Sequence, residues 1–305
     1  MTDVATEETG PEATTPLAGA FASGRPTTGA RARRAAVFWL TRPGLVLSVA
    51  LLALVILAAL FPALLTSRDP LAGVAGQRLQ PPGAAHLFGT DQLGRDLFAR
   101  VVHGCSLTLR ATGLAVAVGL VAGSLVGLLA GYLGGRADDA LMRLIDVLLA
   151  VPGLLLSLAL VTALGFGTVE VAVAVGVTSV AMFARIMRTE VQRVARAPYV
   201  EAARAGGVRW YAVLLRHVVP NAAGPVLVYA AVDFGAVVLQ VSSLSFLGYG
   251  ARPPQPEWGA LVAGGRDYLA SAWWLTTLPG LTIAATVLAA NRIARALDGE
   301  ARGTR

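Results

Sequence analysis

Apolar residues along this chain gather in long runs that contain few or no charges. The first run covers residues 44–65 and the second covers residues 111–133, and neither contains a charged side chain. Because an α-helix rises about 1.5 Å per residue, about 20 apolar residues cross the roughly 30 Å hydrocarbon core of a bilayer. Both runs therefore predict membrane-spanning helices.

Four more apolar runs follow, and two of them contain an aspartate, Asp146 or Asp233. They cover about residues 144–164, 171–187, 222–247 and 274–290. The whole pattern predicts an all-α membrane protein with six transmembrane helices. A carboxylate inside a span is costly and often functional, so both aspartates are candidate functional residues. The simpler alternative for Asp146 is an interfacial ion pair with Arg143.

The composition supports a membrane protein. Hydrophobic residues make up 55% of the 305 residues and charged residues 14%, whereas an ordinary soluble domain carries about 25% charged residues. This excludes a disordered chain, a soluble enzyme of the usual type and a disulfide-stapled secreted domain. The single cysteine, Cys105, excludes an intrachain disulfide and a cysteine-based zinc site, so we interpret it as a small apolar filler.

The arginines predict the orientation of the spans. All 25 basic residues are arginines, and six spans place both termini on the same side of the membrane. With the N-terminus inside, the inner segments hold 18 arginines and the outer loops hold six. Basic residues favour the cytoplasmic side, so we expect both termini in the cytoplasm. The same bias explains the high pI without nucleic-acid binding.

The segment at 86–110, on the outer side, is not explained by membrane insertion alone. Its turn-forming, capping and charged residues are Gly89, Thr90, Asp91, Gly94, Arg95 and Asp96. Either Thr90 or Asp91 is expected to cap a helix that begins near Gln92. Arg95, flanked by two aspartates, predicts a local cluster of ion pairs. The alternative is an external amphipathic helix with a solvated charged face.

The inner loop at 184–221 predicts two short helices joined by a glycine elbow. Residues that precede a proline disfavour the helical conformation, and Pro198 suits the first turn of a new helix. That helix runs to Ala205, and Gly206 and Gly207 end it because glycine accepts positive φ. A second, amphipathic piece follows up to Pro220, where the fifth span starts. The alternative is an interfacial helix that lies among lipid headgroups.

A third stretch follows the fifth span. It reads Ser243-Leu244-Ser245-Phe246-Leu247-Gly248, and then Pro253-Pro254-Gln255-Pro256-Glu257-Trp258-Gly259. The prolines predict a stiff outer turn, and we expect Trp258 to lie in an interfacial aromatic belt.

Taken together, the three stretches resemble the inner-membrane permease of bacterial ABC importers, and more narrowly the C-type permease subunit of the dipeptide/oligopeptide/nickel branch. Gly89-Thr90-Asp91 with Leu93-Gly94-Arg95-Asp96 is similar to the external segment of that branch. Glu201-Ala202-Ala203, Gly207, His217 and Pro220-Asn221 are similar to the cytoplasmic EAA loop of the family. The resemblance covers roughly residues 40–300.

This resemblance implies how the chain is organised. Residues 1–43 would be a flexible cytoplasmic tail, 44–110 the first span with the external segment, 111–298 the permease core with its coupling loop at 184–221, and 299–305 a cytoplasmic tail. The coupling helix would dock on a separate ATPase. The residues that the resemblance assigns to it are Glu201, Ala202, Ala203, Arg204 and Gly207.

The resemblance also implies the partners. They are a second homologous permease that completes the path, two cytoplasmic ATPase subunits, an extracytoplasmic substrate-binding protein and the lipid of the bacterial inner membrane. ATP and magnesium would be bound by the partner ATPases and no cofactor by this chain, because a chain without lysine has no Walker A motif. We expect no catalytic, metal or nucleic-acid site.

Asp233, Gln240 and Ser243 are candidates for the translocation path. Asp233 has two open interpretations: it meets a cationic group such as a peptide amino terminus, or it pairs with the sister subunit. The family usually has an acidic residue two positions before Ser243, where this chain has Val241, and this departure bears on the substrate.

Peptides are the leading substrate class, and nickel or another small solute is the alternative. Two further functions compete with the importer. One is a proton-coupled secondary transporter that uses Asp146 and Asp233, and the other is a membrane anchor for another complex.

Overall fold

The computed structural model describes residues 42–303, with side chains up to residue 296. All regular structure in this range is helical, apart from two isolated bridges at 73–96. Five helices are long and apolar enough to cross a membrane, or six when one bent pair counts as a single span. The predicted all-α class is therefore confirmed, and the predicted six spans agree with the higher of these two counts. The predicted tail at 1–43 lies outside the described residues except for its last two.

Long helices form the bundle, and shorter ones lie at its ends. The long helices are α2 (Pro43–Leu60), α3 (Leu97–Leu133), α6 (Thr168–Ala195), α9 (Val219–Phe246) and α11 (Trp274–Gly303). The shorter helices are α4 (Gly135–Ala150), α5 (Gly153–Leu164), α7 (Pro198–Ala205), α8 (Trp210–Val213) and α10 (Trp258–Gly265). Single turns are η1 (Pro62–Leu64), η2 (Ala75–Gln77), the π-helical η3 (Leu214–Val218) and η4 (Arg266–Tyr268).

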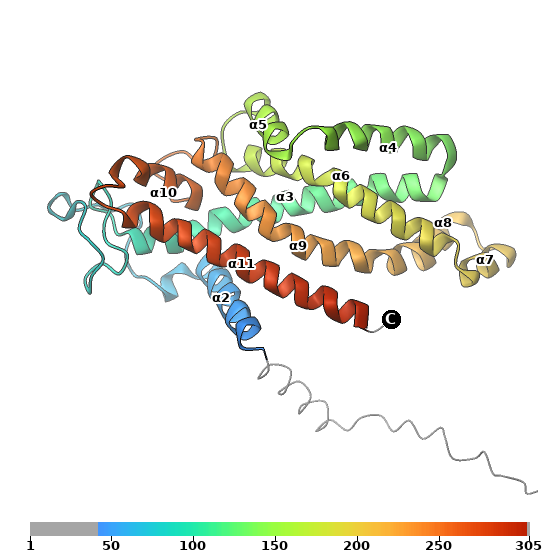
Figure 1. Ribbon diagram of the computed structural model, residues 1–305, viewed down its shortest axis with the longest axis horizontal. Coiled ribbons are helices and arrows are strands. Elements are labelled where there is room, and N and C mark those ends of the chain that lie inside the picture. Colours follow the sequence, from blue (N-terminus) through green and yellow to red (C-terminus); the bar gives the residue numbers. More distant parts are fainter. Residues whose placement is uncertain (1–41, 304–305) are drawn as a thin grey trace, which may run out of the picture. The chain divides into compact units, whose positions relative to one another are not determined.

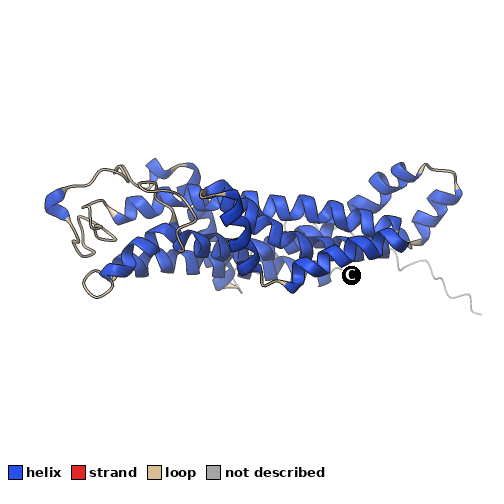
Figure 2. Cartoon of the chain, turned by 90° about the horizontal axis from the view of Figure 1, so that it is seen from above, coloured by secondary structure: helices blue, strands red, loops and turns tan. Residues whose placement is uncertain are grey.

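Helices α3, α6, α9 and α11 run side by side (Figure 1), and Figure 2 shows that irregular chain gathers mainly at the two ends of this bundle. The α10 end carries the long loop between α2 and α3. The α7 end carries α7 and α8. The coupling candidates at 201–207 and the external-segment candidates at 89–96 therefore lie at opposite ends, separated by the length of the bundle.

Small residues let α3 and α6 approach closely. Gly119, Gly123, Gly127 and Gly131 recur every fourth residue along α3, so they lie on one face of the helix. A Cβ atom at Gly127 would collide with the backbone carbonyl of Ala184 on α6. Close backbone approach of this kind is how helices pack in membranes, where the hydrophobic effect does not drive them together.

The predicted third span is broken into α4 and α5, which meet at an angle of 94°. The break falls at Val151 and Pro152, where the residue before proline disfavours the helical conformation. Asp138 of α4 accepts hydrogen bonds from Arg188 of α6, at 2.5 and 2.7 Å. The expected pair of Asp146 with Arg143 is wrong, because Asp146 pairs with Arg185 of α6 at 2.6 Å.

Candidate functional site

The α7 end presents two short helices that are joined at a sharp turn. Helix α7 has Pro198 in its first turn and ends at Ala205, and Gly207 follows with φ +78°. Residues other than glycine rarely adopt this backbone conformation. The predicted ends of α7 and the glycine elbow are therefore confirmed, with the positive φ at Gly207 alone, since Gly206 has φ −74°. Beyond the elbow, α8 leads through the π-helical turn η3 into α9.

Helix α7 has one buried face and one exposed face. Val200 is fully buried against the ends of α6 and α9, and Ala203 is half-buried beside it. Glu201, Ala202 and Arg204 are exposed. Gly207 is exposed as well, so four of the five candidate coupling residues lie on an exposed surface.

Large apolar and aromatic side chains extend that surface. Tyr199, Val208, Trp210, Tyr211 and Leu215 are each more than 40% exposed. Contiguous exposed apolar side chains commonly mark a protein or membrane contact. The glycine elbow thus joins α7 to α8, and exposed side chains on both sides of it are accessible to a partner.

At the α10 end, Asp96 is the N-cap of α3. Its Oδ1 accepts a hydrogen bond from the Ala99 amide at 2.8 Å, and the helix starts at Leu97. The expected cap at Thr90 or Asp91 is therefore wrong. Both residues stabilise the preceding turn instead: Thr90 bonds to the Gln77 carbonyl, and Asp91 accepts from the amides of Leu93 and Arg95.

The charges of this segment are buried and paired. Arg95 Nε lies 2.7 Å from Asp91 Oδ2, as the sequence predicted. Asp96 Oδ2 lies 2.8 Å from His86 Nδ1 and 3.0 Å from Arg68 Nη1. Asp91, Arg95 and Asp96 are each less than 10% exposed, which overturns the alternative of a solvated charged face. Buried charges need such partners because desolvation is costly.

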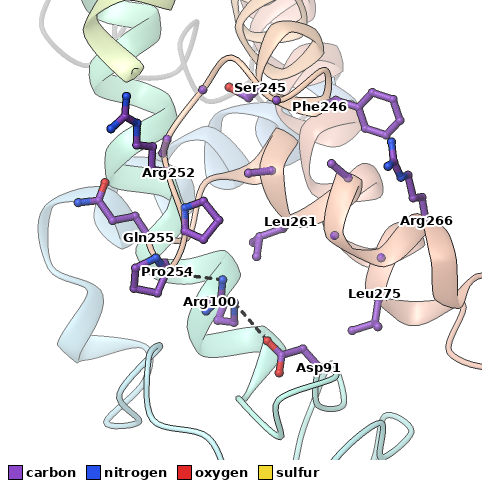
Figure 3. Close-up of a pocket in the computed structure, with 18 of the residues that line it drawn as sticks. Asp91, Arg100, Ser245, Phe246, Arg252, Pro254, Gln255, Leu261, Arg266 and Leu275 are labelled. Carbon is purple, nitrogen blue, oxygen red and sulfur yellow. Dashed lines mark hydrogen bonds and ion pairs between the residues drawn. The ribbon is translucent and has the colours of Figure 1, made fainter. Parts of the chain in front are cut away.

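Sequence reasoning missed Arg100, which ties three segments of this end together. It donates hydrogen bonds to the carbonyls of Pro70 at 3.0 Å and Pro254 at 3.5 Å, and its Nε lies 3.6 Å from Asp91. The only sequence feature that could have indicated this role is that Arg100 is a single charge in the first turn of α3. Figure 3 shows Arg100 between Asp91 and Pro254, in the wall of a cavity of about 800 Å³. Arg252, Gln255 and Arg266 also line this cavity.

Glu257 and Trp258 anchor the end of the loop whose residues 250–255 line the cavity. Glu257 caps α10 by accepting from the amides of Gly259 and Ala260, and it accepts from the Thr108 hydroxyl of α3. Burial raises the pKa of the Glu257 carboxyl. Trp258 donates from its ring nitrogen to the Val101 carbonyl at 3.0 Å and is fully buried. The expected position of Trp258 in an aromatic belt is therefore wrong.

The three candidate path residues do not share one environment. Asp233 is buried inside the subunit, 3.5 Å from the Tyr229 hydroxyl of its own helix. Gln240 is half-buried and donates to the Gly153 carbonyl and the Thr178 hydroxyl, so it joins α9 to α5 and α6. Ser243 is half-buried and bonds back to its own helix. Val241 is buried among apolar side chains.

Several apolar membrane spans with polar structures at both ends define a polytopic membrane protein with a contact surface at the α7 end and a cavity at the α10 end. Residues 123–303 match the family of binding-protein-dependent transport system inner membrane components. The chain belongs to this family, as its permease subunit in the inner membrane. The transport system to which such a subunit belongs also includes a binding protein and an ATPase.

Relatives named as transport permeases agree with this assignment. The chain is 38% identical to the probable D,D-dipeptide transport system permease protein DdpC of Escherichia coli, over 88% of this chain and 90% of that protein. It is 41% identical to the glutathione transport system permease protein GsiD of Pectobacterium atrosepticum, over 69% and 70%. A solved structure of an amino acid ABC transporter with histidines shares the fold, with a TM-score of 0.51 and 20% identity over 68% of this chain and 94% of that one.

Proposed function

We propose that this chain is the permease subunit of an ATP-driven importer of short peptides. The observation that carries this proposal is the α7 end, where a glycine elbow presents Glu201, Ala202 and Arg204 on an exposed surface. A permease of this family needs such a surface to receive the movement of a separate ATPase. The named substrates of DdpC and GsiD, a D,D-dipeptide and glutathione, support peptides over nickel or another small solute.

In this proposal the α7 end faces the cytoplasm and both termini lie there. Two ATPase subunits bind ATP and magnesium, and one of them receives α7. A second, homologous permease completes the path, with Gln240 and Ser243 on its lining. The substrate-binding protein meets the α10 end, where Asp91, Arg95 and Asp96 hold the turn that precedes α3.

Asp233 has a different role in this proposal. Its burial between helices of the same subunit favours a local contact over direct contact with substrate. Its carboxylate then accepts from the Tyr229 hydroxyl one turn earlier in α9.

The proposal predicts that Glu201→Ala and Gly207→Val together abolish peptide uptake. The valine meets a backbone with φ +78°, which β-branched residues avoid, and the alanine removes an exposed charge from α7. Uptake of a labelled dialanine would be measured in cells that contain the whole system, together with the amount of chain in the membrane. Wild-type uptake in the double variant would contradict the coupling assignment.

Glu190→Ala is the matched control, because Glu190 belongs to α6 and pairs with Arg193 of the same helix. It should leave uptake unchanged. Uptake that survives ATP depletion but collapses with the proton gradient would instead support the secondary transporter, and uptake of nickel without dialanine would change the substrate class.

A further inference from the structure

One tyrosine of α3 touches both helices of the coupling loop. Tyr132 is the second-last residue of α3, far in sequence from that loop. Its hydroxyl donates a hydrogen bond to the Trp210 carbonyl, at the start of α8, at 3.0 Å. The guanidinium carbon of Arg204, in the last turn of α7, lies 5.7 Å from the centre of the Tyr132 ring. A cation at this distance over an aromatic ring is attracted to it.

These contacts lie on the two sides of the glycine elbow. The amides of Gly207 and Val208 bond back to the carbonyls of Arg204 and Ala203, so the elbow is held on the α7 side by its own backbone. On the α8 side, the amides of Ala212 and Val213 donate to the carbonyl of Arg209, the N-cap of α8. The Tyr132 side chain therefore supplies a connection between α7 and α8 across a pair of glycines, where the backbone alone is permissive.

Tyr132 also stands on the most closely packed helix pair of the bundle. The preceding residue, Gly131, is so close to α6 that a Cβ atom there would meet the Arg188 carbonyl and Val191. The Tyr132 ring packs against the apolar cluster formed by the ends of α6, α7 and α9. Tyr132 thus connects α7 and α8 to α3 and α6, in addition to the covalent links from α7 to α6 and from α8 to α9.

We propose that Tyr132 is a positioning residue that sets the angle between α7 and α8 and passes their movement to the α3–α6 pair. This inference rests on the proposed function, because it assumes that α7 receives the movement of an ATPase. The ring acts through Arg204 and the apolar cluster, and the hydroxyl acts through the Trp210 carbonyl. The two parts of the side chain are therefore separable by substitution.

The test compares Tyr132→Phe and Tyr132→Leu in the complete transporter, reconstituted with its binding protein and ATPases in liposomes. Peptide uptake and ATP hydrolysis are measured on the same preparation, and the readout is dialanine transported per ATP. Loss of one neutral hydrogen bond predicts a fall of about threefold in Tyr132→Phe, and loss of the ring as well predicts a fall of about tenfold in Tyr132→Leu. Assembly and ATP hydrolysis should persist.

Tyr249→Phe is the matched control. It removes the same hydroxyl from a tyrosine at the α10 end, where the ring stacks on Phe166, and it should leave the ratio unchanged. Arg204→Gln combined with Tyr132→Leu should lower the dialanine transported per ATP no more than the larger of the two single changes does. The effects of two substitutions do not add when both residues act through one contact.

Hydrogen exchange on the same preparations gives a readout without transport. The amides of residues 204–213 should exchange faster in Tyr132→Leu than in the wild type, and those of α3 and α6 should not. The inference would be overturned if Tyr132→Leu left the dialanine transported per ATP unchanged, including the case in which uptake and ATP hydrolysis fall in proportion. Unchanged hydrogen exchange at residues 204–213 would overturn it as well. A wild-type transporter whose uptake does not need ATP would contradict the proposed function itself, and this inference would fall with it.

Discussion

At the scale of single residues, buried charges hold distant segments of this chain together. Asp91 pairs with Arg95 within one turn, and Arg100 then connects that turn to the carbonyls of Pro70 and Pro254. Every residue has a main-chain carbonyl, so no sequence motif predicts which carbonyl a side chain will contact. The local pair of Asp91 with Arg95 was predictable because only four residues separate the partners.

Asp91→Asn should destabilise the fold by about 3 kcal/mol, since removal of one partner leaves a buried charge uncompensated. Asparagine keeps an oxygen for the amides of Leu93 and Arg95, so the loss reports on the ion pair with the arginines. The thermal unfolding midpoint in detergent, followed by tryptophan fluorescence, checks this. Asp267→Asn removes an exposed charge and should leave the midpoint unchanged; an equal loss in both variants would contradict the argument.

At the scale of elements, glycine has opposite effects at different positions of α3. A Cβ at Gly127 would meet the Ala184 backbone of α6, whereas a Cβ at Gly113 would meet nothing within 4 Å. The sequence shows both glycines within one apolar run, and only the packing of α6 distinguishes them. Likewise, Pro152 marks a helix boundary in the sequence, but the 94° bend between α4 and α5 depends on where those helices pack.

Gly127→Ala should therefore cost about 2 kcal/mol, because a backbone carbonyl cannot give way and the two helices must separate. Gly113→Ala should stabilise the chain by about 0.5–1 kcal/mol, because alanine loses less conformational freedom than glycine in a helix. Unfolding of both variants in the same detergent by urea measures the difference. Stabilisation of both variants would show that helix propensity, and not the α3–α6 contact, determines the outcome.

At the scale of the whole molecule, the two ends of the bundle carry different chemistry. The α7 end has an exposed surface on a glycine elbow, and the α10 end has a cavity walled by Arg100, Arg252 and Arg266. A transport subunit requires this difference between its two ends, because the movement of the ATPase acts on one side of the membrane and the substrate enters from the other. The excess of arginines on the segments of the α7 end predicts that this end is cytoplasmic.

A labelling experiment in intact cells tests this orientation. In a Cys105→Ser background, Gln255→Cys at the α10 end should react with a membrane-impermeant maleimide. Asp139→Cys, an exposed position at the start of α4, should react only after the membrane is opened. The reverse pattern would invert the topology and contradict the placement of the coupling loop.

The sequence by itself determined the features that depend on local physics. Six apolar runs long enough to cross a bilayer predicted the fold class, and Pro198 with Gly206 and Gly207 predicted the ends of α7, because proline and glycine act on their own backbone. Three motifs in the right order predicted the family.

Only the tertiary structure decided the contacts between segments that lie far apart in the chain. It placed Asp146 against Arg185 in place of Arg143, buried Trp258 against α3, and brought Tyr132 to the elbow between α7 and α8. In each case the sequence alone is compatible with more than one contact for the side chain. The packing of whole helices selected one of them, because a helix that fits against its neighbour fixes the positions of all its side chains together.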